Sequence, residues 1–454
     1  MIALALVAAV LVGDKVALRA QPDRTSSQQA TLWKGDWVEV RGNKRGWLQV
    51  YDHRHDRPGW IIQANARVVE VDEAHAPALR AIVDFVRDTP GSESLGIAYA
   101  ALYLKAAPAV DGSVWASIGV MAQRLALRVS TAANDATASE QLAVAQSWGL
   151  KFDSVDDRVC YDGDAFAQVL AGKPAPADAA AAVLGLTDPA CIPALLGVSE
   201  RQVLDATRAA LIERVDPTTV PGPLGNELRL RRADIQARLA WSTARHGDLA
   251  AAATAAEAAV SAFARVDKAE LADDDRGVYD ATALVVAASR PASEVAAADA
   301  GKDRLALDVA AGEPGQTCVA VANARQCTHG QVWAGSFRVA PDRAAAAVAV
   351  EPLPGWRELW LFRKGDDGKW MVDVLPPTTD GVDLGYVELA GWSPDGKRAI
   401  VVREGRSDGA VHRSFEVVAM GTLAVERQAG SLGGLGAAKA WAAQPWRART
   451  VALR

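Results

Sequence analysis

The chain has 454 residues, of which 50% are hydrophobic and 23% charged, with a net charge of −6. This length predicts two or three domains, and the hydrophobic content excludes an intrinsically disordered chain. The mild negative charge argues against a general nucleic-acid binder, so we expect no nucleic-acid partner.

The N-terminal residues are apolar and uncharged up to Val12. They are too few for a transmembrane anchor, which needs about twenty apolar residues, so we expect no stable anchor here. Two interpretations of residues 2–12 remain open. They have the length of the apolar core of a signal peptide, but no basic segment precedes them; alternatively, they form an apolar strand that leads into the first domain.

A series of short β motifs follows. Residues 14–22 alternate in polarity and end at a proline, and residues 30–40 hold a Lys-Gly turn between two alternating strands. Residues 46–50 and 59–61 each open with Gly-Trp. In this order the motifs resemble a bacterial SH3-type (SH3b) domain over residues 13–70. The resemblance implies a small SH3-like β-barrel that binds a ligand, usually on the bacterial envelope, and does not itself catalyse a reaction.

The same resemblance implies a ligand groove lined by aromatic side chains. It assigns ligand contact to Trp33 and Trp37, which flank the Lys-Gly turn, and to Tyr51 at the edge of a charged loop. Trp47 and Trp60 occupy the family's structural positions, and we expect them mainly in the core. The alternative is that Trp33 or Trp37 packs against the neighbouring helical domain.

The alternating pattern then gives way to helical spacing, which predicts an antiparallel α-helical domain over residues 75–295. The expected helices cover residues 78–87, 113–129, 138–149, 164–171, 176–185, 199–215, 224–246, 249–266 and 268–289. A further helix, capped by Ser92 or Ser94, is expected to end near residues 107–108. Between two of them, residues 152–164 hold five aspartates. They lack the closing glutamate of a calcium loop, and Asp164 is expected to cap the helix that begins at Ala165.

The chain has four cysteines, none in a C-x-x-C motif, so a zinc site is not expected. A hairpin centred between Cys318 and Cys327 would place these two directly opposite each other, with Asn323 in the left-handed turn position. We predict the disulfides Cys318–Cys327 and Cys160–Cys191. An even number of cysteines with this geometry favours an oxidising compartment, so we expect a periplasmic or exported protein. Buried free thiols are the alternative.

Strand periodicity returns in the last third of the chain. Residues 333–350 and 387–402 align with each other, and each contains a Pro-Asp turn. The sequence Trp-Ser-Pro-Asp-Gly-Lys at residues 392–397 resembles the blade motif of periplasmic β-propeller repeats. We therefore expect a blade-like antiparallel β domain over residues 300–454, packed on the helices. An incomplete propeller closed by a second copy is the alternative. The fold class predicted for the whole chain is multidomain α+β.

The chain has no H-E-x-x-H and no phosphate-binding glycine loop. His53 and His55 share a face and could chelate a metal, but a solvated polar loop is the preferred interpretation. We therefore expect no enzyme, no metal and no cofactor. The predicted function is a non-catalytic envelope binding protein whose barrel engages peptidoglycan peptide or an envelope protein. The alternative is a cell-wall hydrolase or other envelope enzyme that uses the barrel for targeting.

Overall fold

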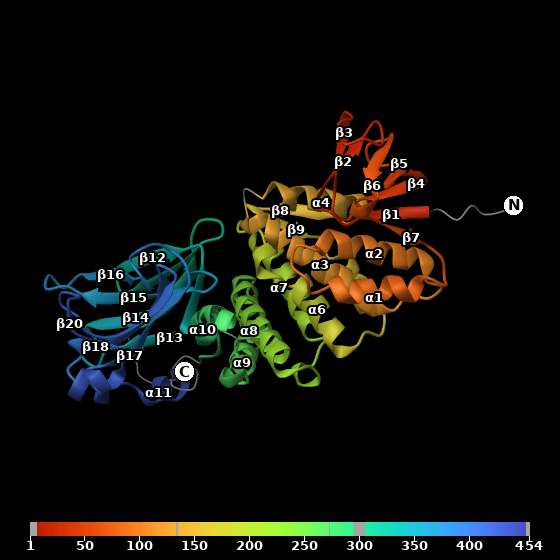
Figure 1. The fold of residues 1–454 in the computed structure, drawn as a ribbon. Helices are drawn as coiled ribbons and strands as arrows, with labels where there is room; N and C mark the ends of the chain where they lie inside the picture. Colours follow the sequence, from red (N-terminus) through yellow and green to blue (C-terminus); the bar gives the residue numbers. More distant parts are fainter. Residues whose placement is uncertain (1–6, 133–134, 272, 295–304, 451–454) are drawn as a thin grey trace. The chain divides into compact units, whose positions relative to one another are not determined.

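The computed structural model describes residues 7–132, 135–271, 273–294 and 305–450 (Figure 1). The chain divides into two compact units, Met1–Leu195 and Leu196–Arg454. An antiparallel sheet opens the first unit, helices occupy the middle of the chain, and strands form most of the last third. This confirms the predicted mixed architecture, with the helical region shared between the two units.

The first unit opens with a seven-stranded antiparallel sheet in the order β3-β2-β6-β5-β4-β1-β7. Its strands are β1 (Val7–Leu11), β2 (Lys15–Arg19), β3 (Gln28–Trp33), β4 (Trp37–Lys44), β5 (Trp47–Asp52), β6 (Arg57–Ile62) and β7 (Ala66–Glu70). Within the described residues, the edge strands β3 and β7 are not paired with each other. The antiparallel sheet is thus confirmed, whereas closure into a barrel is not.

Strand β1 explains the apolar start of the chain. Ala9 and Leu11 pack into the core of the sheet, while Val10, which points to the opposite face, joins the core of the helices. A strand covered on both faces reads as a continuous apolar run. The interpretation as a lead-in strand therefore describes residues 7–11; residues 1–6 of the suggested signal segment lie outside the described residues.

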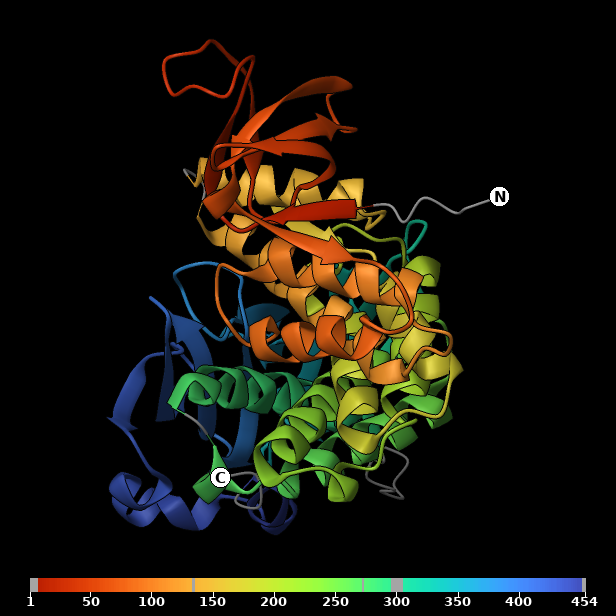
Figure 2. The same cartoon turned by 45° about the vertical axis from the view of Figure 1, so that its right-hand side comes forward.

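Helices and a short hairpin follow the sheet in the described part of the first unit. They are α1 (Ala76–Val86), α2 (Glu93–Ala106), α3 (Gly112–Thr131), α4 (Ala136–Ser147), the hairpin of β8 (Phe152–Val155) and β9 (Arg158–Tyr161), α5 (Asp164–Ala171) and α6 (Pro176–Leu186). Figures 1 and 2 both show the sheet, in red, lying against the orange helices. The predicted cap of α5 is wrong by one residue: Gly163 is the N-cap, at φ +90°, and Asp164 begins the helix.

The second unit starts with helices. They are α7 (Val198–Ile212), α8 (Gly222–Arg245), α9 (Leu249–Ala264), α10 (Arg276–Ser289) and the short 3₁₀ helix η6 (Arg290–Ser293). A tight turn at Gly247 (φ +98°) joins α8 to α9, and the Asp248 side chain caps α9 by accepting from Ala251 N. In place of one helix over residues 268–289, short 3₁₀ turns precede α10; residue 272 lies outside the description.

Two sheets follow in the second unit. The smaller has three strands, β10 (Asp308–Ala311), β11 (Thr317–Val321) and β12 (Ala324–Thr328). The larger comprises β13 (Gln331–Val339), β14 (Ala345–Leu353), β15 (Trp356–Lys364), β16 (Trp370–Leu375), β17 (Gly385–Trp392), β18 (Arg398–Ser407), β19 (Ala410–Ala419) and β20 (Val425–Ala429). It consists of two consecutive four-stranded antiparallel meanders, β13–β16 and β17–β20. A short parallel pairing of β15 with β17 joins them.

Helices α8 and α10 pack on the larger sheet. Trp241 of α8 lies in one apolar cluster with Trp333 and Ala349 of the sheet. Leu284 of α10 packs against Tyr386 in another cluster. The chain then ends its described part with the 3₁₀ segment η7 (Leu432–Trp441) and helix α11 (Gln444–Thr450).

Both predicted disulfides are present. Cys318 and Cys327 are register partners across the β11–β12 hairpin, with their Cα atoms 3.9 Å apart. Cys160 and Cys191 are bonded with a Cα separation of 5.8 Å. The left-handed residue of the hairpin turn is Ala322, at φ +53°, and not Asn323 as expected. In the part of the chain that is described, no helix combines the length and apolar character needed to span a bilayer.

Candidate functional site

The aromatic residues that the sequence places in a groove meet, in part, at one face of the N-terminal sheet. Trp37, the first residue of β4, stacks on His53 with 4.9 Å between ring centres and 18° between planes. Tyr51 meets the same His53 edge-on at 4.9 Å. On its other side Trp37 approaches Trp148, which follows α4, at 6.2 Å. Strand alternation produces this arrangement, since Val38 and Val50 point into the core and their neighbours Trp37 and Tyr51 point away.

Two cations lie against these rings. The Lys105 ammonium is 5.9 Å from the ring centre of Trp37 and 5.4 Å from that of Trp148. The Arg41 guanidinium lies 4.0 Å from the ring centre of Tyr51. All three distances are within the range of cation–π attraction. We call Trp37, Arg41, Tyr51, His53, Lys105 and Trp148 together the aromatic surface.

The two cations differ in their ionic partners. Arg41 pairs with Glu39 at 3.1 Å, and His53 Nε2 lies 3.0 Å from the same carboxylate. The hydrogen bond from Arg41 is the main cause that lowers the pKa of Glu39. Lys105, by contrast, is exposed and has no carboxylate partner within the described part of the chain. The aromatic surface therefore carries one cation that is not neutralised.

A buried carboxylate pair holds the charged loop beside this surface. Asp52 is 1% exposed and accepts from Arg54 N, while its second oxygen lies 2.5 Å from His55 Nδ1. Arg54 also pairs with the buried Asp36 at 3.1 Å. Burial raises the pKa of Asp36, and the hydrogen bond from Trp33 N opposes this shift. His53 and His55 thus face different carboxylates, as expected for a polar loop and not for a histidine pair on one metal.

The remaining tryptophans of the sheet lie elsewhere. Trp33 is half-buried, with the Lys15 ammonium 5.9 Å from its ring centre, and among the described residues its ring meets neither Trp37 nor Tyr51. The expectation that Trp47 and Trp60 lie in the core is wrong. Both are half-buried on the outer face, because the adjacent Leu48 and Ile61 take the inward positions.

Sequence reasoning missed one ring of the aromatic surface, that of Trp148, and both of its cations, Arg41 and Lys105. Trp148 Nε1 donates to the carbonyl oxygen of Gly35 at 3.1 Å. The Ser94 hydroxyl of α2 donates to the neighbouring Lys34 carbonyl at 2.7 Å. The Lys-Gly turn is therefore held by the helices. Trp37 thus packs in part against the helical domain, which was the alternative to ligand contact. Its side chain is only half-buried, so part of the ring stays exposed.

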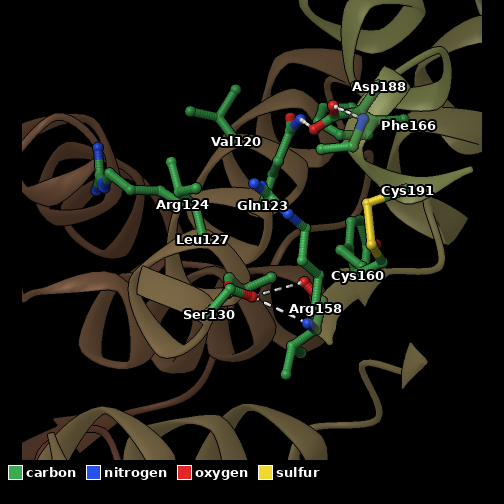
Figure 3. A pocket seen from close by; sticks show the side chains of 15 residues that line it. Val120, Gln123, Arg124, Leu127, Ser130, Arg158, Cys160, Phe166, Asp188 and Cys191 are labelled. Carbon is green, nitrogen blue, oxygen red and sulfur yellow. Dashed lines mark hydrogen bonds between the residues drawn. A yellow bond between two sulfur atoms is a disulfide. The ribbon is translucent and has the colours of Figure 1, made fainter. Parts of the chain in front are cut away.

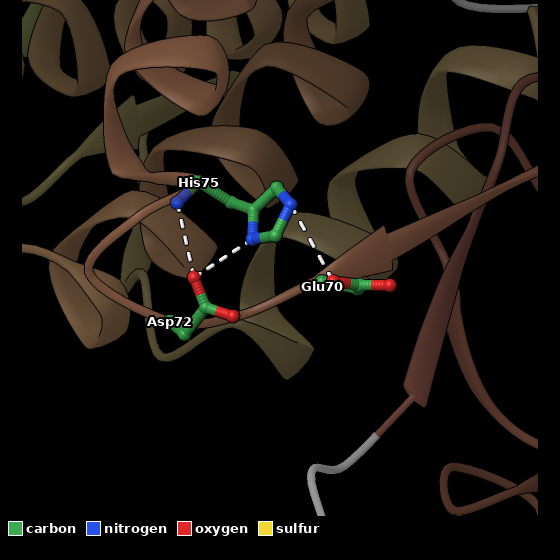
Figure 4. A group of neighbouring side chains, drawn as sticks. All are labelled: Glu70, Asp72 and His75. Carbon is green, nitrogen blue, oxygen red and sulfur yellow. Dashed lines mark hydrogen bonds and ion pairs between the residues drawn. The ribbon is translucent and has the colours of Figure 1, made fainter.

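A second group was also missed by the sequence analysis (Figure 4). Glu70, Asp72 and His75 offer ligand atoms within 4.8 Å of one another. His75 Nδ1 lies 2.7 Å from Asp72, and Nε2 lies 3.4 Å from Glu70. The hydrogen bond to Asp72 raises the pKa of His75, whereas a metal ligand must be a neutral imidazole. A His75 ring that hydrogen-bonds to Asp72 and lies at ion-pair distance from Glu70 accounts for the arrangement without a metal.

A pocket of about 270 Å³ lies beside the Cys160–Cys191 disulfide (Figure 3). Some of its polar groups pair with each other: Gln123 donates to Asp188 at 3.0 Å, and the Ser130 hydroxyl accepts from Val159 N at 2.9 Å. Burial raises the pKa of Tyr161, another lining residue, to about 12, so its phenol stays neutral. This pocket holds no activated nucleophile or base among the residues named.

Comparisons with known proteins add no name to this site. No family model matches the chain, and searches of curated proteins and of solved structures gave no match either.

Proposed function

We propose that this protein is a non-catalytic binding protein of the bacterial envelope and that its N-terminal sheet engages cell-wall peptide through the aromatic surface. The observation that carries the proposal is the exposed Lys105 ammonium, which lies against the rings of Trp37 and Trp148 without a carboxylate partner in the described chain. A peptide offers both a carboxylate for such a cation and apolar groups for the rings.

Two further features support this proposal. Residues 13–70, which resemble an SH3b domain, fall within the antiparallel sheet that carries Trp37 and Tyr51. The two disulfides are typical of an oxidising environment, so we propose a periplasmic or exported location. The paired four-stranded meanders are compatible with the resemblance to propeller blades, and we propose that they serve as a further interaction surface.

A pelleting experiment with purified peptidoglycan tests the proposal. The intact protein is expected to sediment with the cell-wall material without releasing soluble fragments. Release of muropeptides would instead indicate the alternative function, an envelope hydrolase. Failure to sediment would reject cell-wall peptide as the ligand and direct the search to an envelope protein.

Single substitutions test whether the aromatic surface is the contact. Lys105→Ala removes an exposed cation and is expected to weaken binding about fivefold at an unchanged melting temperature. Lys44→Ala, at an exposed lysine of the same sheet outside the surface, is the matched control and should bind normally. Equal loss in both variants would indicate a general charge effect and contradict the proposed contact.

The predicted aromatic contacts are tested in the same way. Trp37→Ala and Tyr51→Ala are expected to reduce pelleting, whereas Trp47→Ala, at a half-buried tryptophan outside the aromatic surface, should not. Trp33→Ala decides whether that residue, which lies apart from the other two, contributes to the same groove. A fall in melting temperature with binding intact would mark the substituted ring as a packing residue.

A further inference from the structure

The second unit contains a cavity of about 570 Å³ that is separate from the aromatic surface. It is bordered by η6, by strands β13, β15 and β17, and by the segment from Trp441 to Trp446. Its apolar wall includes the indole rings of Trp392, Trp441 and Trp446. A cavity of this size, largely apolar with a few polar groups, is typical of small-molecule sites.

A buried carboxylate organises the polar side of this cavity. Glu388 of β17 accepts from Arg357 Nη2 at 3.1 Å, from Arg290 Nη2, and from Trp446 Nε1 at 2.8 Å. Arg357 is 1% exposed and Arg290 is 5% exposed, so both guanidinium groups are held away from solvent. Arg357 is fixed further by donating to the carbonyl oxygen of Ala287 at 2.9 Å.

Positive charge exceeds negative charge among the described residues that line the cavity. Three arginines, Arg290, Arg338 and Arg357, face two glutamates, Glu294 and Glu388, which leaves a net charge of +1 (three minus two). Placing an uncompensated cation in a poorly solvated site is unfavourable, and an anion in the cavity would offset this cost.

Several donors of the same side chains also lack an acceptor. Within the described residues, Arg290 Nε and Nη1, Arg357 Nε and Trp392 Nε1 are buried without a hydrogen-bond partner. All of them are N–H groups, so an acceptor is needed to satisfy them, either a water molecule or an oxygen atom of a ligand. Native structures rarely leave such groups unpaired, and a cluster of them calls for an explanation.

The composition of the walls favours a carboxylate over a phosphate. A monoanion would neutralise the net charge of +1, whereas a phosphate dianion would exceed it and approach Glu294 and Glu388. A free phosphate would also leave the three indole rings without contact. Arginine guanidinium groups bind carboxylates in planar, often bidentate, geometry.

We propose that this cavity binds a small carboxylate whose apolar or aromatic body lies against the indole rings. The carboxylate pairs with Arg338 and with the donors of Arg290 and Arg357, which are not used by Glu388. The body contacts Trp392, Trp441 and Trp446. This site is independent of peptide binding by the N-terminal sheet.

Titration of the intact protein with two probe carboxylates, phenylacetate and hexanoate, tests the chemical class. Isothermal titration calorimetry and tryptophan fluorescence should both detect saturable binding of at least one probe. Phenylacetamide, which keeps the ring but lacks the charge, should bind at least about tenfold more weakly, because it cannot form the charge-assisted hydrogen bonds. Inorganic phosphate should not bind.

Substitutions locate the binding to this cavity. Arg338→Gln is expected to weaken the probe carboxylate about tenfold or more. Arg406→Gln is the matched control: its side chain is 37% exposed against 38% for Arg338, it also pairs with one aspartate or glutamate, and it lies outside the cavity. Trp392→Phe keeps an aromatic ring and removes the unpartnered N–H, and should weaken binding at an unchanged melting temperature.

Three outcomes would overturn the proposal: no binding of either carboxylate, equal binding of phenylacetate and phenylacetamide, or phosphate binding without carboxylate binding. If Arg338→Gln and Arg406→Gln weakened carboxylate binding equally, the proposed location of the site would be contradicted. Because none of these titrations involves peptidoglycan, their failure is distinguishable from failure of the proposed function.

Discussion

The indole N–H of Trp148 donates a 3.1 Å hydrogen bond to the carbonyl oxygen of Gly35, which precedes it by 113 residues. This bond joins the end of a helix to the turn between β3 and β4. The same turn receives the Ser94 hydroxyl at the Lys34 carbonyl. The Lys34-Gly35 turn is therefore a junction between the sheet and the helices, whereas an SH3-like groove would leave this turn open to a ligand. Trp37 follows the turn, at the start of β4.

Because of this junction, we expect Gly35→Ala to lower the free energy of unfolding strongly. Gly35 has φ +90°, and a Cβ there would lie 2.5 Å from the Ser94 carbonyl oxygen. The left-handed backbone and the collision together should lower the free energy of unfolding by about 3 kcal/mol or more. Gly46→Ala is the control, since Gly46 has φ +83° with nothing within 4 Å of the added Cβ, and should cost only about 1 kcal/mol. Urea unfolding that gives equal losses would contradict the close contact.

Removal of each disulfide should destabilise the unit that contains it. The Cys160–Cys191 bond spans 31 residues and the Cys318–Cys327 bond spans 9. Loop-closure entropy predicts losses of about 3.5 and about 2.5 kcal/mol for the paired alanine variants. Denaturant unfolding of the two double variants checks the order. Mass spectra that show four free thiols in protein from its native compartment would contradict both predictions and the proposal that the protein is exported.

Ala322→Gly should stabilise the β11–β12 hairpin. Ala322 is exposed and takes φ +53°, a conformation that costs alanine about 1 kcal/mol relative to glycine. The free energy of unfolding should therefore rise by up to about 1 kcal/mol. Ala320→Gly, within β11 of the same hairpin, should lower it by about 0.5–1 kcal/mol. Thermal unfolding in which both variants lose stability would reject the left-handed assignment.

The buried Glu351 predicts a specific pH dependence. Burial raises the pKa of its carboxyl from 4.5 to about 7, although Gly355 N and Trp333 Nε1 donate to it. Since the folded protein holds this proton more tightly than the unfolded chain, the stabilisation is fully present below pH 4.5. It is lost as pH rises to about 7, and amounts to about 3 kcal/mol.

Comparison with Glu351→Gln isolates this contribution. The variant carries no titrating group at the position, so the difference in unfolding free energy between the two proteins should change between pH 4.5 and 7 and stay constant above. Chemical denaturation across this range provides the measurement. A difference that does not vary with pH would show that Glu351 is ionised in the folded protein.

Local signals in the sequence determined much of the secondary structure. Helical spacing located α3 and α6 within two residues, and the equal spacing of Cys318 and Cys327 about a turn predicted their pairing in register. These features depend on neighbouring residues along one strand or helix, where period and turn chemistry act directly.

Only the tertiary structure decided the sites and the role of the first residues. Trp148 and Lys105 reach Trp37 from two different helices, and Glu388 meets Arg290 across 98 residues of sequence. The periodicity of the sequence cannot predict such pairs, because they form only when separate helices and strands pack together. The apolar run at residues 7–11 was equally ambiguous, since a signal segment and a strand buried on both faces have the same composition; the structure shows these residues paired with β4 and β7.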